Sequence, residues 1–225
     1  MKEQIDLINN IMDKFHENDF LDEIILVGSW CLYYYSKYFF KTPELSLLRT
    51  KDIDFVIEKP QQITKHIDIK KILEDAGFEE FIGISGYSKF MNIDLDIEFL
   101  VNEKGRSSNK PAILKKININ AMPLRYLSIL QNHTTMIKIN DYNLRLPEPA
   151  AFVLHKYIIS NRRREKTKRE KDLYDAQNLS NILIQDNYHK AILKNVYNDM
   201  PNGWKKTLKN ILQENNLILY NEIVS

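Results

Sequence analysis

The sequence predicts an α+β fold in which a sheet covered by helices is followed by a helical region. Up to about residue 146, short apolar or alternating segments typical of strands are interspersed with segments of helical periodicity. Pro147-Glu148-Pro149 then interrupts the chain, and only helical periodicity follows it. We therefore predict a sheet-containing domain at residues 1–146 and a helical domain at residues 147–225.

The composition restricts the classes of protein to which the chain can belong. With 44% apolar residues it can bury a full core, and 32 basic against 30 acidic side chains give no overall charge that would indicate nucleic-acid binding. Cys31 is the single cysteine, which excludes an internal disulfide, and the five histidines are too scattered for a His/Cys zinc site. Because the start has no apolar signal segment and no apolar run reaches the ~20 residues that cross a bilayer, we expect a cytoplasmic protein with no membrane partner.

The first strand is expected to end in a turn that can bind phosphate. Apolar residues at helical spacing predict a helix at residues 3–17, and residues 23–27 form an apolar run typical of a buried strand. Gly28-Ser29 interrupts that run, and an aromatic-rich helix is expected from Trp30. The unpaired N–H groups at such a helix start can bind a phosphate. The alternative is that Gly28 only permits the turn and Ser29 only caps the helix.

Two carboxylates after Arg49 give the strongest indication of a functional site. Residues two apart in a strand point to the same face, so Asp52 and Asp54 are expected to project together while Ile53 and Phe55 face the core. Two carboxylates ~4 Å apart repel by ~4 kcal/mol at an effective dielectric of ~20, which favours a divalent metal between them. The alternative is a half-solvated strand whose outer face is acidic.

A helix and a hairpin are expected after this first acidic strand. Helical periodicity covers residues 63–76 and ends at Gly77, which suits the left-handed position after a helix. A hairpin is predicted at residues 79–90, turning at Gly83 to Gly86. These elements return the chain to the sheet for another strand.

Residues 93–100 show the clearest period-two alternation in the chain. Ile93 is expected to begin the face directed at the core, whereas Asp94, Asp96 and Glu98 share the other face. If this strand lies beside the first acidic strand, five carboxylates converge on one side of the sheet. Bound cations, neighbouring Lys or Arg residues, or exposure of the outer members must then offset their repulsion.

The remaining segments complete the two predicted domains. Strands are expected at residues 114–119, 136–139 and 144–146, with a turn at Asn140-Asp141 and a short helix at 123–130. Beyond the prolines, helices are expected at residues 150–159, 165–184, 187–198 and 204–213.

A basic segment lies between the first two of these C-terminal helices. Seven of the ten residues from Arg162 to Lys171 are Lys or Arg. One interpretation is a solvated helix start whose charges form i,i+4 ion pairs. The other is a local positive field that attracts the phosphates of a nucleotide or a polynucleotide.

Taken together, these segments resemble the nucleotidyltransferase superfamily related to DNA polymerase β. Its members carry an apolar strand ending in Gly-Ser or Gly-Gly, a carboxylate-x-carboxylate strand, and a third acid on a later apolar strand. The matching segments are Leu26-Val27-Gly28-Ser29, Asp52-Ile53-Asp54-Phe55 and Ile97-Glu98-Phe99-Leu100. The resemblance implies a polymerase-β-like mixed sheet with flanking helices, followed by the C-terminal helical region.

More narrowly, the chain resembles a bacterial branch akin to the AbiEii-type nucleotidyltransferase toxins. That branch shows an Arg-x-x-Asp-x-Asp strand and a helical tail with a lysine followed by Arg, Lys-Asp and a further Asp. The matching residues are Arg49 to Asp54, His155-Lys156, Arg162 to Arg164, Lys171-Asp172 and Asp175.

The resemblance implies a two-ion Mg²⁺ site, with Mn²⁺ as a possible substitute. Asp52, Asp54 and Glu98 would be the catalytic, metal-binding acids, and Asp96 is the alternative third acid because it also lies between apolar residues. The expected nucleotide-binding residues are Gly28, Ser29, Arg49, Lys51, Lys156, Lys171, Asp172 and Asp175. For the last two, ion pairs with Lys168 and Lys171 are the alternative role.

The implied reaction is metal-dependent transfer of a nucleoside monophosphate from an NTP to an acceptor hydroxyl. The acceptor would be tRNA or another RNA, or a protein, and an antitoxin is a possible partner. The alternative is a non-catalytic module that keeps the nucleotidyltransferase fold and binds nucleic acid or a partner protein, possibly within a toxin–antitoxin pair.

Overall fold

The computed structural model describes residues 2–42, 50–103 and 110–224, which form two compact units. The first unit contains residues up to Leu127 together with Met136–Leu146, and the second contains Ser128–Thr135 together with the chain from Pro147. The boundary predicted at residue 146 assigns the segment 128–135 to the first domain. In the structure this segment groups with the C-terminal helices instead.

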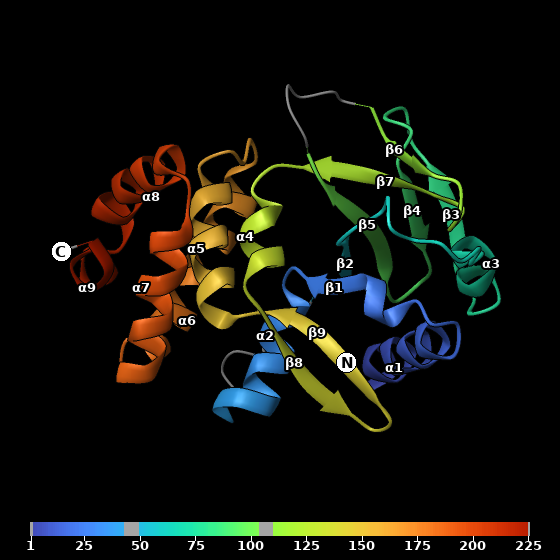
Figure 1. The fold of residues 1–225 in the computed structure, drawn as a ribbon, viewed down its shortest axis with the longest axis horizontal. Coiled ribbons are helices and arrows are strands. Elements are labelled where there is room, and N and C mark those ends of the chain that lie inside the picture. Colours follow the sequence, from blue (N-terminus) through green and yellow to red (C-terminus); the bar gives the residue numbers. More distant parts are fainter. Residues whose placement is uncertain (1, 43–49, 104–109, 225) are drawn as a thin grey trace. The chain divides into compact units, whose positions relative to one another are not determined.

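A mixed sheet forms the centre of the first unit (Figure 1). Its path runs β1-β2-β5-β4-β3, with β7 pairing with β5 and β6 pairing with β7. The strands are β1 (Ile24–Val27), β2 (Asp52–Ile57), β3 (Glu79–Ile82), β4 (Ser88–Met91), β5 (Asp96–Asn102), β6 (Ala112–Leu114) and β7 (Ile119–Leu124). β2 and β5 are parallel, whereas β1 and β4 run antiparallel to these neighbours, so the central strands are fixed on both edges.

Aromatic side chains pack one face of this sheet against helix α1 (Lys2–Glu17). Phe15 of α1 contacts Phe55 of β2 at a ring-centroid distance of 5.7 Å, and Phe55 stacks on Phe99 of β5 at 5.8 Å. Ile53 and Ile97 are buried in the same register. Since strand residues alternate in direction, packing of these side chains leaves their acidic neighbours on the opposite face.

The rest of the first unit consists of short helices and a hairpin. The helical segments are η1 (Leu21–Glu23), α2 (Trp30–Tyr35), η2 (Ser36–Phe40) and α3 (Ile69–Glu74). β8 (Thr134–Ile139) and β9 (Tyr142–Pro147) form the hairpin, and Arg145 joins it to the sheet through Glu58 and the carbonyl of Asp22.

The second unit is helical. It contains α4 (Leu127–Asn132) from Ser128 onward, α5 (Pro149–Ser160), α6 (Lys166–Leu183), α7 (Asn187–Asp199), α8 (Asn202–Asn215) and α9 (Leu217–Val224). Asn216, between α8 and α9, donates hydrogen bonds from Nδ2 to Tyr157 Oη of α5 and Ser180 Oγ of α6. No helix within the described residues is long and apolar enough to span a membrane.

The predicted α+β fold with a C-terminal helical region is confirmed, but several boundaries differ. The predicted helix at 63–76 is reduced to α3, because the amides of Ile67 and Ile69 donate to the carbonyls of Lys116 and Ile117 instead of forming a helical turn. The predicted strand at 114–119 is the turn between β6 and β7, and the predicted helix at 123–130 begins only at Leu127.

The second acidic strand also begins later than predicted. The Asn92 side-chain oxygen accepts hydrogen bonds from the amides of Asp94 and Leu95, which makes a turn that ends β4 and delays β5 until Asp96. Ile93, predicted to face the core, is therefore 90% exposed.

Candidate functional site

Four carboxylates lie on one face of the sheet, on the two parallel strands β2 and β5. Asp52 pairs in register with Asp96, and Asp54 pairs with Glu98. The two acidic strands are therefore adjacent, which is the condition under which their carboxylates converge, and residues in register on neighbouring strands point to the same side. Their apolar neighbours are buried on the opposite face, so the packing of the sheet holds the four acids together.

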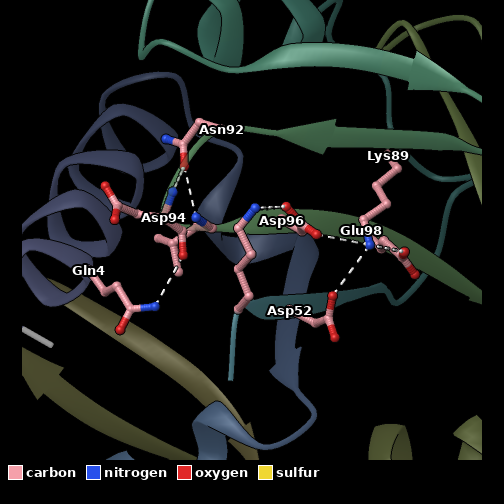
Figure 2. Close-up of polar contacts among 9 residues, drawn as sticks. Gln4, Asp52, Lys89, Asn92, Asp94, Asp96 and Glu98 are labelled. Carbon is pink, nitrogen blue, oxygen red and sulfur yellow. Dashed lines mark hydrogen bonds and ion pairs between the residues drawn. The ribbon is translucent and has the colours of Figure 1, made fainter. Parts of the chain in front are cut away.

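The fifth acid of the predicted cluster is not part of it. Asp94 lies in the turn before β5, where its amide donates to Asn92 Oδ1 and its carbonyl accepts from the side chain of Gln4. Figure 2 shows Asp94 near Gln4 and Asn92, apart from Asp52 and Glu98.

The turn after β1 approaches Asp54 closely. Val27 pairs in register with Asp54, and Gly28 follows it with a φ of +77°. A Cβ atom at Gly28 would lie 2.5 Å from Asp54 Oδ2, so only glycine fits the backbone conformation and the available space. The predicted Gly-Ser turn therefore lies directly beside the acidic strand.

Ser29 follows this turn and precedes α2. Its side chain is half-buried and forms no capping hydrogen bond with the helix, so the capping alternative for Ser29 is not observed. Lys51 lies at the other end of the site, before β2. Arg49, the other predicted nucleotide-binding residue of this segment, lies outside the described residues.

Lys89 of β4 extends into the carboxylate cluster (Figure 2). Its Nζ atom lies 3.3 Å from Asp52 Oδ1, 3.1 Å from Asp96 Oδ2 and 3.3 Å from Glu98 Oε1. Partial burial opposes the charge on Lys89, but the hydrogen bond to Asp96 and the charges of Glu98 and Asp52 outweigh it and raise the lysine pKa. Lys89 was not predicted as a site residue, because its position opposite Glu98 depends on the register between β4 and β5, which the local sequence pattern does not contain.

The two candidates for the third acid differ in their surroundings. Asp96 is paired with both Lys89 and Lys51, whose Nζ lies 3.1 Å from Asp96 Oδ1, and its side chain is only 10% exposed. Glu98 contacts Lys89, is 23% exposed and lies opposite Asp54. Glu98 is thus the more accessible of the two acids.

The donor atoms of the cluster match the preference of Mg²⁺ for carboxylate oxygens. Within the described part of the chain, however, no three His, Cys, Asp or Glu side chains are arranged to hold a metal ion in their present positions. The oxygens of Asp52, Asp96 and Glu98 instead surround the ammonium group of Lys89 at hydrogen-bonding distances. The ligand chemistry fits the expected ion, and the present geometry fits a lysine.

A second group of charged residues lies in the helical unit. Lys156 of α5 is buried, and its Nζ lies 2.6 Å from Asp172 Oδ1 and 3.2 Å from Asp175 Oδ2, both on α6. Arg163 Nε donates to Asp172 Oδ2 over 2.7 Å. The alternative prediction that Asp172 pairs with Lys168 or Lys171 is wrong. Its partner is Lys156 of the neighbouring helix, and Lys168 pairs with Glu165.

The two aspartates of this group have opposite pKa shifts. Burial would raise the pKa of Asp172, but the charge of Lys156 and the hydrogen bonds from Lys156 and Arg163 lower it overall. Burial raises the pKa of Asp175, whose oxygens have no hydrogen bond of good geometry within the described chain. The neighbouring His155 is held neutral, since burial lowers its pKa to about 3.

The basic segment before and in the first turns of α6 is exposed from Arg162 to Glu170. Some of its charges are paired locally, with Lys166 3.7 Å from Glu170 and Lys168 3.3 Å from Glu165. Lys171 is half-buried at the end of this segment. The predicted local ion pairing is therefore present, and attraction of phosphates by this segment stays a prediction.

The sequence was compared with models of known protein families. A family model described as Nucleotidyltransferase matches residues 7–200, which include the acidic strands, the Gly28 turn and the Lys156 group. The chain belongs to this nucleotidyltransferase family. Its membership supports transfer of a nucleoside monophosphate as the general activity, and the predicted superfamily is confirmed.

Two solved structures are similar to this chain at low sequence identity. An antigenic nucleotidyltransferase-like protein from Paracoccidioides brasiliensis is 14% identical, with a TM-score of 0.53 over 97% of this chain and 92% of that chain. The antibiotic-resistance factor ANT(2'')-Ia is 13% identical, with a TM-score of 0.46 over 88% of this chain and 92% of its own. No curated protein matches the sequence.

Proposed function

We propose that this nucleotidyltransferase is a metal-dependent enzyme that transfers a nucleoside monophosphate from an NTP to an acceptor hydroxyl. The observation that carries the proposal is the pairing of Asp54 with Glu98, beside a Gly28 turn that leaves no room for a larger residue. In the transfer, the acceptor hydroxyl loses its proton to solvent and its oxygen bonds to the α-phosphorus, while the bond from that phosphorus to the β-phosphate oxygen breaks and pyrophosphate leaves.

Asp52, Asp54 and Glu98 are the residues that would hold Mg²⁺, or Mn²⁺ in its place. Such ions stabilise the charge on the entering and leaving oxygens of a phosphoryl transfer. The side chains of Asp52 and Glu98 are 60% and 23% exposed, so solvent and substrate can reach both. The fixed backbone of β2 and β5 keeps the acids in register before substrate binds, which lowers the cost of ordering them.

We assign binding of the nucleotide to the Gly28 turn and to exposed or half-buried cations. In the sheet-containing unit, Gly28 and Ser29 would bind its phosphates, and Lys51, which is 43% exposed, would contribute positive charge. In the helical unit we assign this role to Lys171, with Lys156, Asp172 and Asp175 as the buried group that orients the surrounding helices. The exposed basic segment at 162–170 favours RNA, including tRNA, as the acceptor over a protein.

A narrower placement with the AbiEii-type toxins is part of the proposal. It rests on the Arg-x-x-Asp-x-Asp segment and on the Lys156, Lys171 and Asp175 pattern. On this assignment an antitoxin protein would be the physiological partner.

One observation favours a second function, that of a non-catalytic module which binds nucleic acid or a partner protein. Lys89 closes an ion-pair network with Asp52, Asp96 and Glu98, and such a network can stabilise a fold without any metal. Salt-dependent RNA binding without nucleotide turnover would identify this function.

A labelling experiment tests the proposed activity. The purified chain is incubated with each α-³²P-labelled NTP, Mg²⁺, and either total RNA or total protein, and label transfer is compared with that of an Asp52→Asn/Asp54→Asn double variant. Asp94→Asn is the matched control, because this acid lies in the turn outside the cluster. We expect wild type and the control to label RNA and the double variant to fail. Equal labelling by all three proteins, or by none, contradicts the proposal.

A further inference from the structure

Lys89 is the one cation in the described chain that contacts three members of the carboxylate cluster at once. Figure 2 shows its side chain reaching from β4 toward Asp52, Asp96 and Glu98. These acids include two of the three that we assign to the metal. The ammonium group therefore lies between Asp52 and Glu98, two of the three expected metal ligands.

The position of Lys89 is fixed by the sheet. Lys89 pairs in register with Glu98, and the preceding Ser88 is buried, donates from Oγ to Glu80 Oε1 over 2.6 Å and accepts from the amide of Asn120 over 3.0 Å. The backbone of β4 is thus held on both sides. The Lys89 side chain is long, flexible and 29% exposed, so its ammonium group can leave the cluster for solvent while the backbone stays in place.

A divalent ion and the ammonium group exclude one another at this position. Mg²⁺ binds carboxylate oxygens at ~2.1 Å, closer than the 3.1–3.3 Å at which Lys89 Nζ contacts the same side chains. An ion bound by Asp52 and Glu98 would therefore lie within a few ångströms of a like charge, and a repulsion of this kind is strong in a partly buried site.

We propose that Lys89 is a positioning residue that holds the carboxylate groups of Asp52, Asp96 and Glu98 around one cation when no metal is bound, and competes with the divalent ion for Asp52 and Glu98. This inference rests on the proposed function, since it assigns the metal to the same acids. It explains how the chain folds with four adjacent carboxylates: an internal cation offsets their repulsion, and metal loading replaces that cation.

The test is a direct measurement of Mn²⁺ binding without nucleotide, from the free-ion signal in electron paramagnetic resonance. Wild type is compared with Lys89→Met, with Lys89→Arg, which retains the charge, and with Asp54→Asn. Lys71→Met is the matched control, because Lys71 forms an exposed 3.1 Å ion pair with Asp75 of its own helical segment, outside the cluster.

We expect Lys89→Met to bind Mn²⁺ about tenfold more tightly than wild type, because a competing charge is removed. Lys89→Arg and Lys71→Met are expected to bind as wild type does. The metal-free melting temperature of Lys89→Met should be lower than that of wild type, and Mn²⁺ should raise it by a larger amount. Equal or weaker Mn²⁺ binding by Lys89→Met overturns the inference.

The outcomes separate the two proposals. If Asp54→Asn weakens Mn²⁺ binding while Lys89→Met leaves it unchanged, the metal site stands and only the role of Lys89 fails. If wild type and Lys89→Met both bind no Mn²⁺, the metal-dependent function fails and the inference fails with it.

A measurement on the unmodified sequence covers the case in which Lys89→Met does not fold. Lysines of the wild-type chain are reductively methylated with ¹³C, and the Lys89 resonance is assigned by its loss in Lys89→Arg. We expect Mg²⁺ to shift this resonance as the amine leaves the carboxylates. A resonance that does not move at saturating Mg²⁺ contradicts the inference.

Discussion

Gly28 and Asp54 are so close that a single methyl group cannot be placed between them: a Cβ atom at Gly28 would lie 2.5 Å from Asp54 Oδ2. The contact joins the end of β1 to the acidic strand β2, with Val27 and Asp54 in register. The contact brings the Gly28 turn against the acidic strand, so the shape of the turn determines where the carboxylate of Asp54 can lie.

Replacement of Gly28 by alanine is expected to reduce activity much more than stability. The alanine must displace Asp54, and a misplacement of about 1 Å costs about 100-fold in rate, while the positive φ costs about 1–3 kcal/mol. Gly77→Ala is the control, since Gly77 has a φ of +86° and nothing within 4 Å of the added atom. Steady-state kinetics and urea unfolding should show similar destabilisation of both variants and loss of activity only in Gly28→Ala; equal activity of the two contradicts the role of the contact.

Glu98 and Asp96 are the two candidates for the third metal-binding acid, and neutralising each in turn distinguishes them. We expect Glu98→Gln to lower kcat by at least about 100-fold, because Glu98 is opposite Asp54 and more exposed than Asp96. Asp96→Asn should retain more activity, since Asp96 is held between Lys51 and Lys89. A greater loss of kcat in Asp96→Asn would assign the role to Asp96.

Asp172 is expected to stabilise the helical unit above acidic pH. Its lowered folded pKa means that the stabilisation is complete above the unfolded value of ~3.9 and is lost as the pH falls through the folded pKa. Asp172→Asn removes this carboxylate from Arg163, leaves Lys156 with Asp175 alone, and should cost about 3 kcal/mol at pH 7. Urea midpoints should converge with those of wild type as the pH falls through the lowered folded pKa of Asp172; a difference independent of pH contradicts the ion-pair origin.

Asp175, on the same helix, has a pKa shifted in the opposite direction from that of Asp172. Since burial raises its folded pKa, the ionised form opposes folding above that pKa, whereas the protonated form present at lower pH does not. Asp175→Asn should therefore cost less at pH 7 than Asp172→Asn does, as Lys156 keeps Asp172 as its partner. An equal loss of stability in the two variants, measured by urea unfolding, would show that both carboxylates are stabilising.

Lys171 is expected to affect nucleotide binding without affecting the fold. Replacement by methionine should raise the KM for the NTP several-fold, because one positive charge is removed, and should change stability by less than about 0.5 kcal/mol. Lys194→Met on the exposed surface of α7 is the control. An unchanged KM would remove Lys171 from the proposed nucleotide site.

The acidic strands were predictable because their alternation is forced by burial. Ile53 and Phe55 are buried, so Asp52 and Asp54 must lie on the opposite face of the sheet. In the same way, burial of Ile97 places Glu98 on that opposite face. The boundary before β5 was not predictable from the alternation alone, since the hydrogen bonds of the Asn92 side chain interrupt a pattern that otherwise continues through Ile93.

Pairings between distant segments were the harder part of the prediction. The carboxylate of Asp172 takes its partner from another helix, Lys156 of α5, rather than from its own helix surface. Lys89 reaches the acids through the register of a hairpin with its neighbouring strand, and a one-residue change in that register would turn it to the other face. Such contacts depend on tertiary alignment, which local periodicity does not contain.

The assignment of residues 128–135 to the helical unit means that the chain passes from one unit to the other three times. A single proteolytic cut cannot release either unit intact, and a fragment that starts at Pro147 lacks the α4 segment of its own unit. During synthesis on the ribosome, the helical unit receives its first segment before the sheet-containing unit has received its last hairpin, so the two must mature in overlapping order.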